Sequence, residues 1–207
     1  MKLKLFFFAL LAQLFSSGAA FAYDAEIDGI YYNFILSSEV EVTSGDDKYT
    51  GDIVIPEMVT YNKITYSVTS IGKYAFYNCY GLTSVTIGNS VSSIGDYAFN
   101  GCRGLTSVTI PESVTNIDNM AFSNCTNLND IHISDVAAWC RIEFKDNREF
   151  LLPHRMFLND VEITDLVIPE GVTDIGLCAF RYCINLTSVT IPKSVTKLSA
   201  GAFAGCI

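Results

Sequence analysis

Cysteine is the residue type whose spacing in this chain first suggests chemistry. The 207-residue sequence has seven cysteines, enough in an exported protein for a disulfide framework. Five of them recur at one position of a 23-residue pattern: Cys79, Cys102, Cys125, Cys183 and Cys206. Side chains at one repeat position point the same way in successive turns, which fits disulfide geometry poorly. The spacing therefore predicts a ladder of buried thiols that act as small apolar groups. Cys140 and Cys178 lie outside this series, and their redox state stays open.

Histidine, aspartate and serine are the other candidates for catalysis or metal binding. His132 and His154 are the only histidines, and the sequence has no CxxC or HxxxH spacing for zinc. The adjacent Asp46 and Asp47 lack the repeated acidic spacing of a calcium site and are typical of a turn. No GxSxG, GxGxxG or phosphate-loop motif is present. The sequence predicts no catalytic residue, no metal and no cofactor, and an enzyme remains a distant alternative.

The elements that position these residues come from an internal repeat. Residues 82–104, LTSVTIGNSVSSIGDYAFNGCRG, are followed at once by residues 105–127, LTSVTIPESVTNIDNMAFSNCTN. Further copies lie at 53–81, 128–162, 163–185 and 186–207. The copy at 53–81 is stretched, and the copy at 128–162 is 35 residues long. A repeat of this length is one supersecondary unit stacked on its neighbours, so the sequence predicts a solenoid.

Each coil needs its neighbours in order to fold. Burying the eight apolar side chains of residues 82–104 contributes at most about 12–24 kcal/mol, whereas ordering about 23 backbones costs about 23–46 kcal/mol. The segment TSVTI alternates polar and apolar residues, which predicts a short strand with Val85 and Ile87 inward. Proline or glycine then ends the strand, as at Pro111 and Gly88. The following IGxxAFxxC half predicts a single turn or 3₁₀ segment whose phenylalanine fills the core.

The repeat LTSVTIPxSVTxIGxxAFxxCxx resembles the BspA-like class of leucine-rich repeats, known from secreted and surface proteins of mucosa-dwelling bacteria and some protists. The proline slot, the Ala-Phe pair and the cysteine recur in register, and the resemblance covers about residues 24–207. The resemblance implies a curved, right-handed, mainly β solenoid with one short parallel strand per repeat. It also implies an adhesion or protein-interaction module.

The two ends of the chain carry separate signals. Residues 1–22 combine Lys2 and Lys4, an apolar run and a terminal Ala-Phe-Ala, which predicts a cleaved signal peptide and a secreted or cell-surface protein. Residues 23–67 predict a β cap that overlaps the first stretched repeat, with a hairpin turn at Asn62 and Lys63. The leucine-rich repeats are expected over 53–207. Because the last coil is one residue short, we expect a truncated product or an end covered by another chain.

The outward face of the predicted sheet is the candidate binding surface. Its columns hold Ser84, Thr86, Ser107, Thr109, Asp130, His132, Asp165, Ser188 and Thr190, with Val167 beside Asp165. Such hydroxyls are also good strand surface without any ligand. The long copy is the informative part, because it places Asp130 and His132 in columns of serine and threonine.

The insert at 134–162 of the long copy supplies further candidate contacts. Ser134 is a candidate N-cap for a helix over DVAAWCRIEF, with Val136, Trp139, Cys140 and Phe144 on one face. Trp139, Arg141 and Arg148 are residue types that interface hot spots favour. A helix also needs such residues in order to dock on the flank of the solenoid, and this alternative stays open.

Charge restricts the class of partner. The chain has a net charge of −9, and removal of Lys2 and Lys4 leaves 11 basic against 22 acidic residues, or −11. Such a surface repels nucleic acid and anionic lipid, and no later segment is long and apolar enough to span a membrane. The sequence favours a module that binds a host extracellular or surface protein, and less a glycan, through the sheet face. The alternative is a spacer that self-associates through its C-terminal coil.

Overall fold

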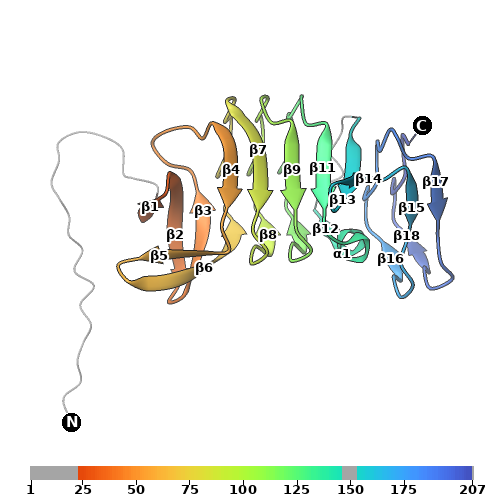
Figure 1. The fold of residues 1–207 in the computed structure, drawn as a ribbon, viewed down its shortest axis with the longest axis horizontal. Coiled ribbons are helices and arrows are strands. Elements are labelled where there is room, and N and C mark those ends of the chain that lie inside the picture. Colours follow the sequence, from red (N-terminus) through yellow and green to blue (C-terminus); the bar gives the residue numbers. More distant parts are fainter. Residues whose placement is uncertain (1–22, 146–152, 207) are drawn as a thin grey trace, which may run out of the picture.

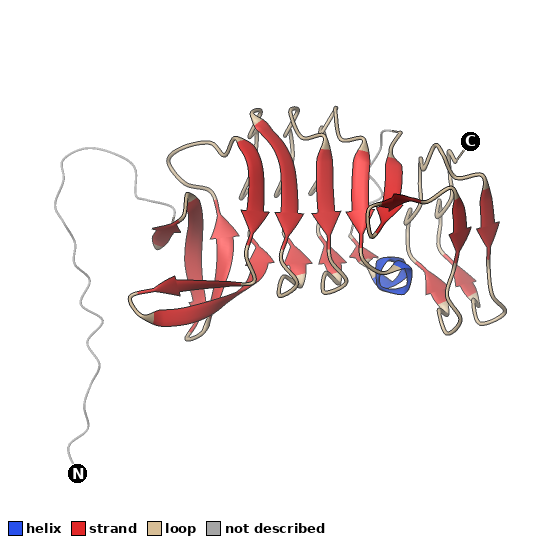
Figure 2. Ribbon diagram, viewed as in Figure 1, coloured by secondary structure: helices blue, strands red, loops and turns tan. Residues whose placement is uncertain are grey.

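Short strands stack along an elongated molecule in which nearly every regular element is β (Figure 1). The structure is a computed structural model, and it describes residues 23–145 and 153–206. Among these residues the one helix is α1, Val136–Arg141, which lies beside the strands at one point of the stack (Figure 2). The predicted signal peptide lies outside the described residues.

The first sheet has six strands in the order β14-β13-β11-β9-β7-β4. Their bounds are β4 (Gly51–Ile55), β7 (Leu82–Ile87), β9 (Ser107–Ile110), β11 (Asp130–Ile133), β13 (Arg155–Leu158) and β14 (Val161–Glu162). All neighbours are parallel except β13 and β14. The β-branched TSVTI segments at 83–87 and 106–110 thus become strands of this sheet, as their alternation predicts.

The second sheet joins the N-terminal strands to the opposite side of each coil. It contains β1 (Ala25–Ile27), β2 (Ile30–Leu36), β3 (Glu39–Thr43), β5 (Met58–Tyr61), β6 (Ile64–Ile71), β8 (Ser93–Ile94), β10 (Asn116–Ile117) and β12 (Glu143–Phe144). The strands β5 and β6 form an antiparallel hairpin around Asn62 and Lys63, both with positive φ. A regular coil therefore has two strands, one per sheet, where the sequence predicted one.

The last two coils form strand pairs of their own. β15 (Asp165–Val167) pairs with β17 (Ser188–Thr190), and β16 (Asp174–Ile175) pairs with β18 (Lys197–Leu198). Neither pair joins the longer sheets. The described chain thus consists of a long stack and two further coils, separated at β14 and α1 (Figure 1).

The core follows the repeat. Val85, Ile87 and their counterparts at 105–185 are buried, whereas Val189 and Ile191 of the last coil are 36% and 46% exposed. Phenylalanine rings of neighbouring coils also stack on one another. The ring centroids of Phe76 and Phe99 are 4.7 Å apart, and those of Phe99 and Phe122 are 4.9 Å apart. The same arrangement, at 5.3 Å, recurs between Phe180 and Phe203. Stacked aromatic rings thus run through the coils where the pattern predicted core residues.

The repeated cysteines form the ladder that their spacing predicts. All seven cysteines are free thiols. Cys102 Sγ lies 2.9 Å from the carbonyl oxygen of Phe76, and Cys125 Sγ lies 3.0 Å from that of Phe99, so each thiol donates to the preceding coil. The hydrogen bond with the Cys125 thiol, together with burial, raises the pKa of Cys102 to about 12. The Cys102 thiol therefore stays protonated at neutral pH and acts as a core residue.

The long repeat differs from its prediction in three details. The N-cap of α1 is Asp135, whose carboxylate accepts the backbone N–H of Ala138, and not Ser134. Phe144 belongs to β12 and not to the helix. Residues 155–162 form the antiparallel hairpin of β13 and β14, which the sequence did not predict. The 35 residues thus hold a coil plus an extra strand, β13, in the first sheet.

Among the described residues, several contacts connect the long stack to the last two coils. Trp139 Nε1 donates to the carbonyl oxygen of Ala179 at 2.7 Å. The backbone N–H of Gly176 donates to the carbonyl of Cys140 at 3.0 Å. His154 forms a parallel bridge with Cys183. The helix and the residue that precedes β13 therefore supply contacts that hold the two parts of the solenoid together.

Candidate interaction surface

Strand register brings the predicted hydroxyl columns side by side on the first sheet. Ser84 lies opposite Ser107, and Thr86 lies opposite Thr109. The register continues to β11, where Asp130 and His132 take the next positions. The intervening apolar side chains point into the core and are buried, because successive residues of a strand face opposite sides. The outward face is thus a rigid, polar array.

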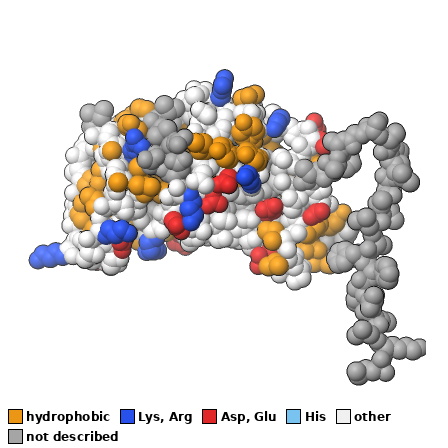
Figure 3. All heavy atoms as spheres, turned by 180° about the vertical axis from the view of Figure 1, so that it is seen from behind, with side chains coloured by type: hydrophobic (Ala, Val, Ile, Leu, Met, Phe, Trp, Pro, Cys, Tyr) orange, Lys and Arg blue, Asp and Glu red, His pale blue; other side chains and the backbone are white. Residues whose placement is uncertain are grey.

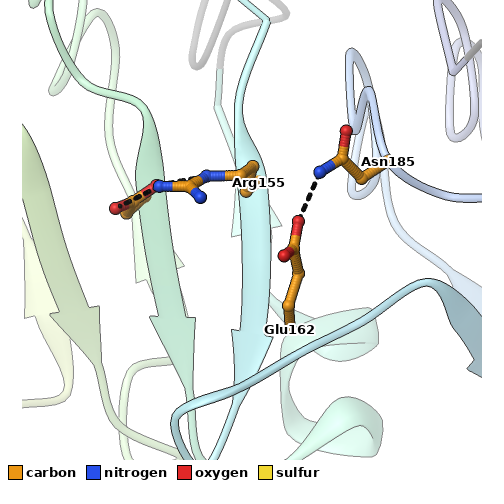
Figure 4. A network of polar contacts seen from close by, with 4 residues as sticks. Arg155, Glu162 and Asn185 are labelled. Atoms are coloured by element: carbon orange, nitrogen blue, oxygen red, sulfur yellow. Dashed lines mark hydrogen bonds and ion pairs between the residues drawn. The ribbon is translucent and has the colours of Figure 1, made fainter.

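An ion pair forms where this face reaches β13. Arg155 donates from Nε and Nη2 to the two carboxylate oxygens of Asp130, both at 2.9 Å. Figure 4 shows this two-pronged contact across neighbouring strands. The side chain of Arg155 is 43% exposed and that of Asp130 is 26% exposed. A bidentate geometry fixes both groups in direction while leaving the pair accessible from solvent.

An imidazole and an aromatic ring stack beside the ion pair. The ring centroids of His132 and Phe157 are 4.6 Å apart, with 9° between the planes. His132 Nδ1 lies 2.9 Å from an oxygen of Asp160 in the hairpin turn. The Arg155 guanidinium also lies near this ring, 5.4 Å from the centre of Phe157. We call Asp130, His132, Arg155, Phe157 and Asp160 the β11–β13 cluster.

The outward faces of the long stack and of the last two coils each start with an aspartate that accepts hydrogen bonds from the next strand. Asp52 on β4 accepts hydrogen bonds from the Ser84 and Thr83 hydroxyls at 2.6 and 2.7 Å. Asp165 on β15 accepts hydrogen bonds from Ser188 and Thr187. The hydrogen bond from Ser84, followed by that from Thr83, lowers the pKa of Asp52, and the hydrogen bond from Ser188 does the same for Asp165. Both carboxylates are thus held as anions.

Charge and apolar surface are mixed elsewhere. Figure 3 shows the molecule from behind, where acidic and basic side chains are scattered among separate apolar patches. No group of three or more histidine, cysteine, aspartate or glutamate side chains in the described ranges could hold a metal ion. Over the same ranges no helix is long and apolar enough to cross a membrane.

Comparison with protein families identifies the repeat. The model of the BspA type leucine rich repeat region matches residues 57–141 and 151–207 in six copies. The chain belongs to this family. The matched residues coincide with the stacked coils described above, and the leucine-rich repeat is a non-catalytic fold typical of protein–protein interaction modules.

Two solved leucine-rich repeat structures are similar to this BspA-type chain. A leucine-rich repeat protein from Bacteroides ovatus is 35% identical with a TM-score of 0.57, over 89% of this chain and 45% of that one. A leucine rich cell surface protein from Faecalibacterium prausnitzii is 26% identical with a TM-score of 0.52, over 92% of this chain and 53% of that one. The chain thus spans about half the length of these proteins. No curated protein matches it.

The predicted site residues divide into three groups. Ser84, Thr86, Ser107, Thr109, Asp130 and His132 lie together on the outward face, as their spacing predicts. Asp165, Ser188 and Thr190 are exposed but lie on the separate pair of β15 and β17. The expectation that Asp165 follows Asp130 across the sheet is wrong, because β13 intervenes and Arg155 takes that position.

The three predicted insert contacts have different outcomes. Trp139 is 2% exposed and packs in the core, so it docks the helix and offers no contact to a partner. Arg141 ends α1 and is exposed. Arg148 lies outside the described residues. The sequence left two roles open for the insert, contact with a partner and docking on the solenoid. Trp139 takes part in docking.

Four residues of the outward face were missed from the sequence. Asp52 and Val54 on β4 precede Ser84 and Thr86 in the same columns, and Arg155 and Phe157 on β13 follow Asp130 and His132. A usable signal existed in the segment RMFL at 155–158. It alternates outward and inward side chains as DIHI does at 130–133, but it lies outside the 23-residue phase.

Proposed function

We propose that the chain is an exported, non-catalytic module that binds a protein partner through the outward face of the first sheet, centred on the β11–β13 cluster. One observation carries the proposal. Along this face the hydroxyls of β7 and β9 give way to the Asp130–Arg155 ion pair and the stacked rings of His132 and Phe157. Arginine and aromatic side chains are the types that interface hot spots favour.

The fixed geometry of the cluster supports binding with little loss of conformational entropy. Arg155 is held by two hydrogen bonds, and Phe157 stacks on an imidazole and lies near a guanidinium. Side chains that are ordered before association lose less freedom when a partner arrives. The mixture of acid, base and aromatic ring suits a protein surface better than a uniformly charged polymer, so a glycan is the less favoured ligand.

Export and surface display are part of the proposal. They rest on the signal-like residues 1–22 and on the leucine rich cell surface protein from Faecalibacterium prausnitzii, to which the chain is similar. A host extracellular or surface protein is the partner that this location favours. The experiment therefore uses extracellular material as the source of the partner.

The test has a capture step and a variant step. Immobilised residues 23–207 are exposed to host extracellular matrix extract, and captured proteins are identified and titrated back. We expect Phe157→Ala, and separately the pair Asp130→Ala with His132→Ala, to weaken binding about tenfold or more. Thr86→Ala on β7, on the part of the face away from the cluster, is the comparison variant and should weaken binding less than the cluster variants do.

The spacer interpretation predicts a different pattern. If the chain serves only as a structural unit, no captured protein responds to substitutions in the β11–β13 cluster. Equal affinities of the wild type, Phe157→Ala and Thr86→Ala would therefore overturn the proposed binding face. Self-association through the C-terminal coil stays a prediction, and sedimentation of residues 23–207 tests it directly.

A further inference from the structure

The first sheet stops at β14, and β15 begins a new strand pair with one free edge. Thr164 accepts a hydrogen bond from the backbone N–H of Thr187 at 2.7 Å, and Ile168 donates its backbone N–H to Thr190 at 3.0 Å. The main-chain groups of these alternate residues therefore face β17. Because the direction alternates along a strand, the N–H and C=O groups of Asp165 and Val167 face the opposite edge.

No strand in the described parts of the chain pairs with that edge of β15. In the described residues, these two N–H and two C=O groups take part in no strand pairing and have the spacing of a parallel ladder. Unpaired strand edges are templates for another strand, and natural proteins commonly cover or shorten them. This edge lies inside the solenoid, beside β14, which crosses from β13 toward β15 (Figure 1).

A groove of about 340 Å³ runs along this edge. Its lining is mainly apolar and comprises Val136, Leu158, Val161, Glu162, Ile163, Thr164, Asp165, Leu166 and Val167. Val161 is 70% exposed and Val167 is 61% exposed, although both lie on strands. We call this feature the β15 groove.

The only charged groups among the lining residues are two carboxylates, and both are held in place. Glu162 accepts a hydrogen bond from Asn185, as Figure 4 shows. Asp165 accepts hydrogen bonds from Ser188 and Thr187. A ligand of this groove therefore meets apolar surface, a strand edge and fixed negative charge.

We propose that the β15 groove binds an extended segment of a partner protein, which adds a strand to β15 through Asp165 and Val167. An apolar side chain of the segment packs against Val161 and Val167, and a flanking lysine or arginine lies near Glu162 and Asp165. This mode of recognition takes affinity from main-chain hydrogen bonds and specificity from side-chain contacts. The proposal does not depend on the β11–β13 cluster.

The chemistry of the edge decides the class of occupant. A helix has no spare main-chain groups along its length, so it would leave the edge groups of β15 without partners. An apolar small molecule would cover Val161 and Val167 but would also desolvate those groups at a cost. An extended peptide satisfies them and fills the groove at the same time.

The test uses a defined peptide. The probe is KLTSVTIK, which is the strand Leu82–Ile87 with a lysine at each end, because this strand fills the corresponding position in the regular coils. We expect binding with a Kd below about 1 mM. We also expect hydrogen exchange at the amides of Asp165 and Val167 to slow about tenfold or more when the peptide saturates the protein. Absence of binding, or unchanged exchange at these two amides, overturns the proposal.

Backbone-modified peptides separate strand addition from simple apolar contact. Two versions of the probe carry N-methyl groups at the alternate amide sets, so one version blocks the amides that face β15. We expect that version to bind about tenfold more weakly than the other. Equal affinity of both versions overturns strand addition, and this comparison needs no protein variant.

Protein variants then locate the site. Val167→Pro removes an edge-facing N–H, which an edge strand tolerates, and we expect about fivefold weaker binding or more. Val167→Thr keeps the N–H and is the control. Glu162→Gln should weaken binding of the lysine-flanked probe two- to fivefold, about the range of an exposed ion pair, and should not affect a serine-flanked probe. Protection of Asp165 and Val167 in a dimer without peptide would identify a second copy as occupant and overturn the partner assignment.

Discussion

The regular coils at 82–127 and the long repeat at 128–162 are built on the same sheet but carry different information. In the regular coils, serine lies beside serine and threonine beside threonine on the outward face. In the long repeat, β11 and β13 bring together an ion pair, an imidazole and a phenyl ring. Repetition supplies a rigid scaffold, and departures from the repeat supply side chains that can distinguish one partner from another.

The same comparison holds for stability. A regular coil pairs with neighbouring coils on both sides through both sheets, whereas the long repeat connects to the last coils through separate contacts of α1 and His154. In a solenoid the free energy of unfolding is approximately a sum of coil terms and neighbour terms. The junction at the long repeat should therefore be the place where the molecule divides into two cooperative units once a contact there is removed.

Trp139→Ala should have the largest effect on this division. Trp139 is 2% exposed, contacts Phe144 edge-on and donates to the carbonyl of Ala179. Removing the indole leaves a cavity and a carbonyl without its donor, which we expect to cost about 5 kcal/mol. Urea unfolding followed by far-UV circular dichroism should then show two transitions, with the last coils unfolding first.

Trp139→Phe is the control, because it keeps most of the apolar volume and loses only the N–H donor. It should retain one transition with a smaller decrease in stability. A single cooperative transition in Trp139→Ala, with no early loss of hydrogen-exchange protection in residues 164–206, would show that the junction does not divide the solenoid.

Phe99→Ala should have the next largest effect, but without division. Its ring is fully buried between those of Phe76 and Phe122. The cavity should lower the free energy of unfolding by about 4 kcal/mol. Because coils on both sides of Phe99 continue the stack, we expect one transition at lower urea. Phe99→Leu is the volume-matched control, and two transitions in Phe99→Ala would contradict the difference between the two regions.

The sequence predicted most of the regular coils because their physical signals agree. Alternation, β-branched residues and the proline or glycine slot all place Val85 and Ile87 inward, and the 23-residue period sets the register. It did not predict the second strand of each coil, β8 or β10, because two residues are too short to show alternation. Those strands form because the backbones of neighbouring coils lie in register and pair with one another.

The site was only partly predictable for a related reason. Asp130 and His132 lie in phase with the repeat, so their positions followed from the period. Arg155 lies 25 residues after Asp130, and the 23-residue period predicts no strand at that distance. Its place depends on how residues 134–162 fold against the stack, which is a tertiary effect. Asp52 was missed because the stretched first copy hides its register.

The Asp130–Arg155 pair should contribute less to the free energy of unfolding than Trp139 or Phe99 does. Asp130→Ala removes both hydrogen bonds from Arg155, and since the pair is partly exposed we expect a loss of about 1 kcal/mol. Ser107→Ala, at the adjacent regular position, should change stability by less than about 0.5 kcal/mol. A double-mutant cycle with Arg155→Ala measures the coupling. A coupling energy of zero would mean that the long repeat is no more strongly connected across its face than the regular coils.

The smallest effect should be the pH dependence that Asp52 and Asp165 share. Hydroxyl donors lower the pKa of each carboxylate in the folded chain, so the folded state binds a proton less readily than the unfolded state. The corresponding stabilisation is present above the unfolded pKa, about 3.9, and is lost as the pH falls through the folded pKa. Ser84→Ala should raise the pKa of Asp52 toward its ordinary value and leave Asp165 unchanged, whereas Ser188→Ala should do the reverse. Carbon-detected NMR titration of the two carboxylates measures both shifts, and a shift of both aspartates in either variant would show that the two parts of the solenoid are not electrostatically independent.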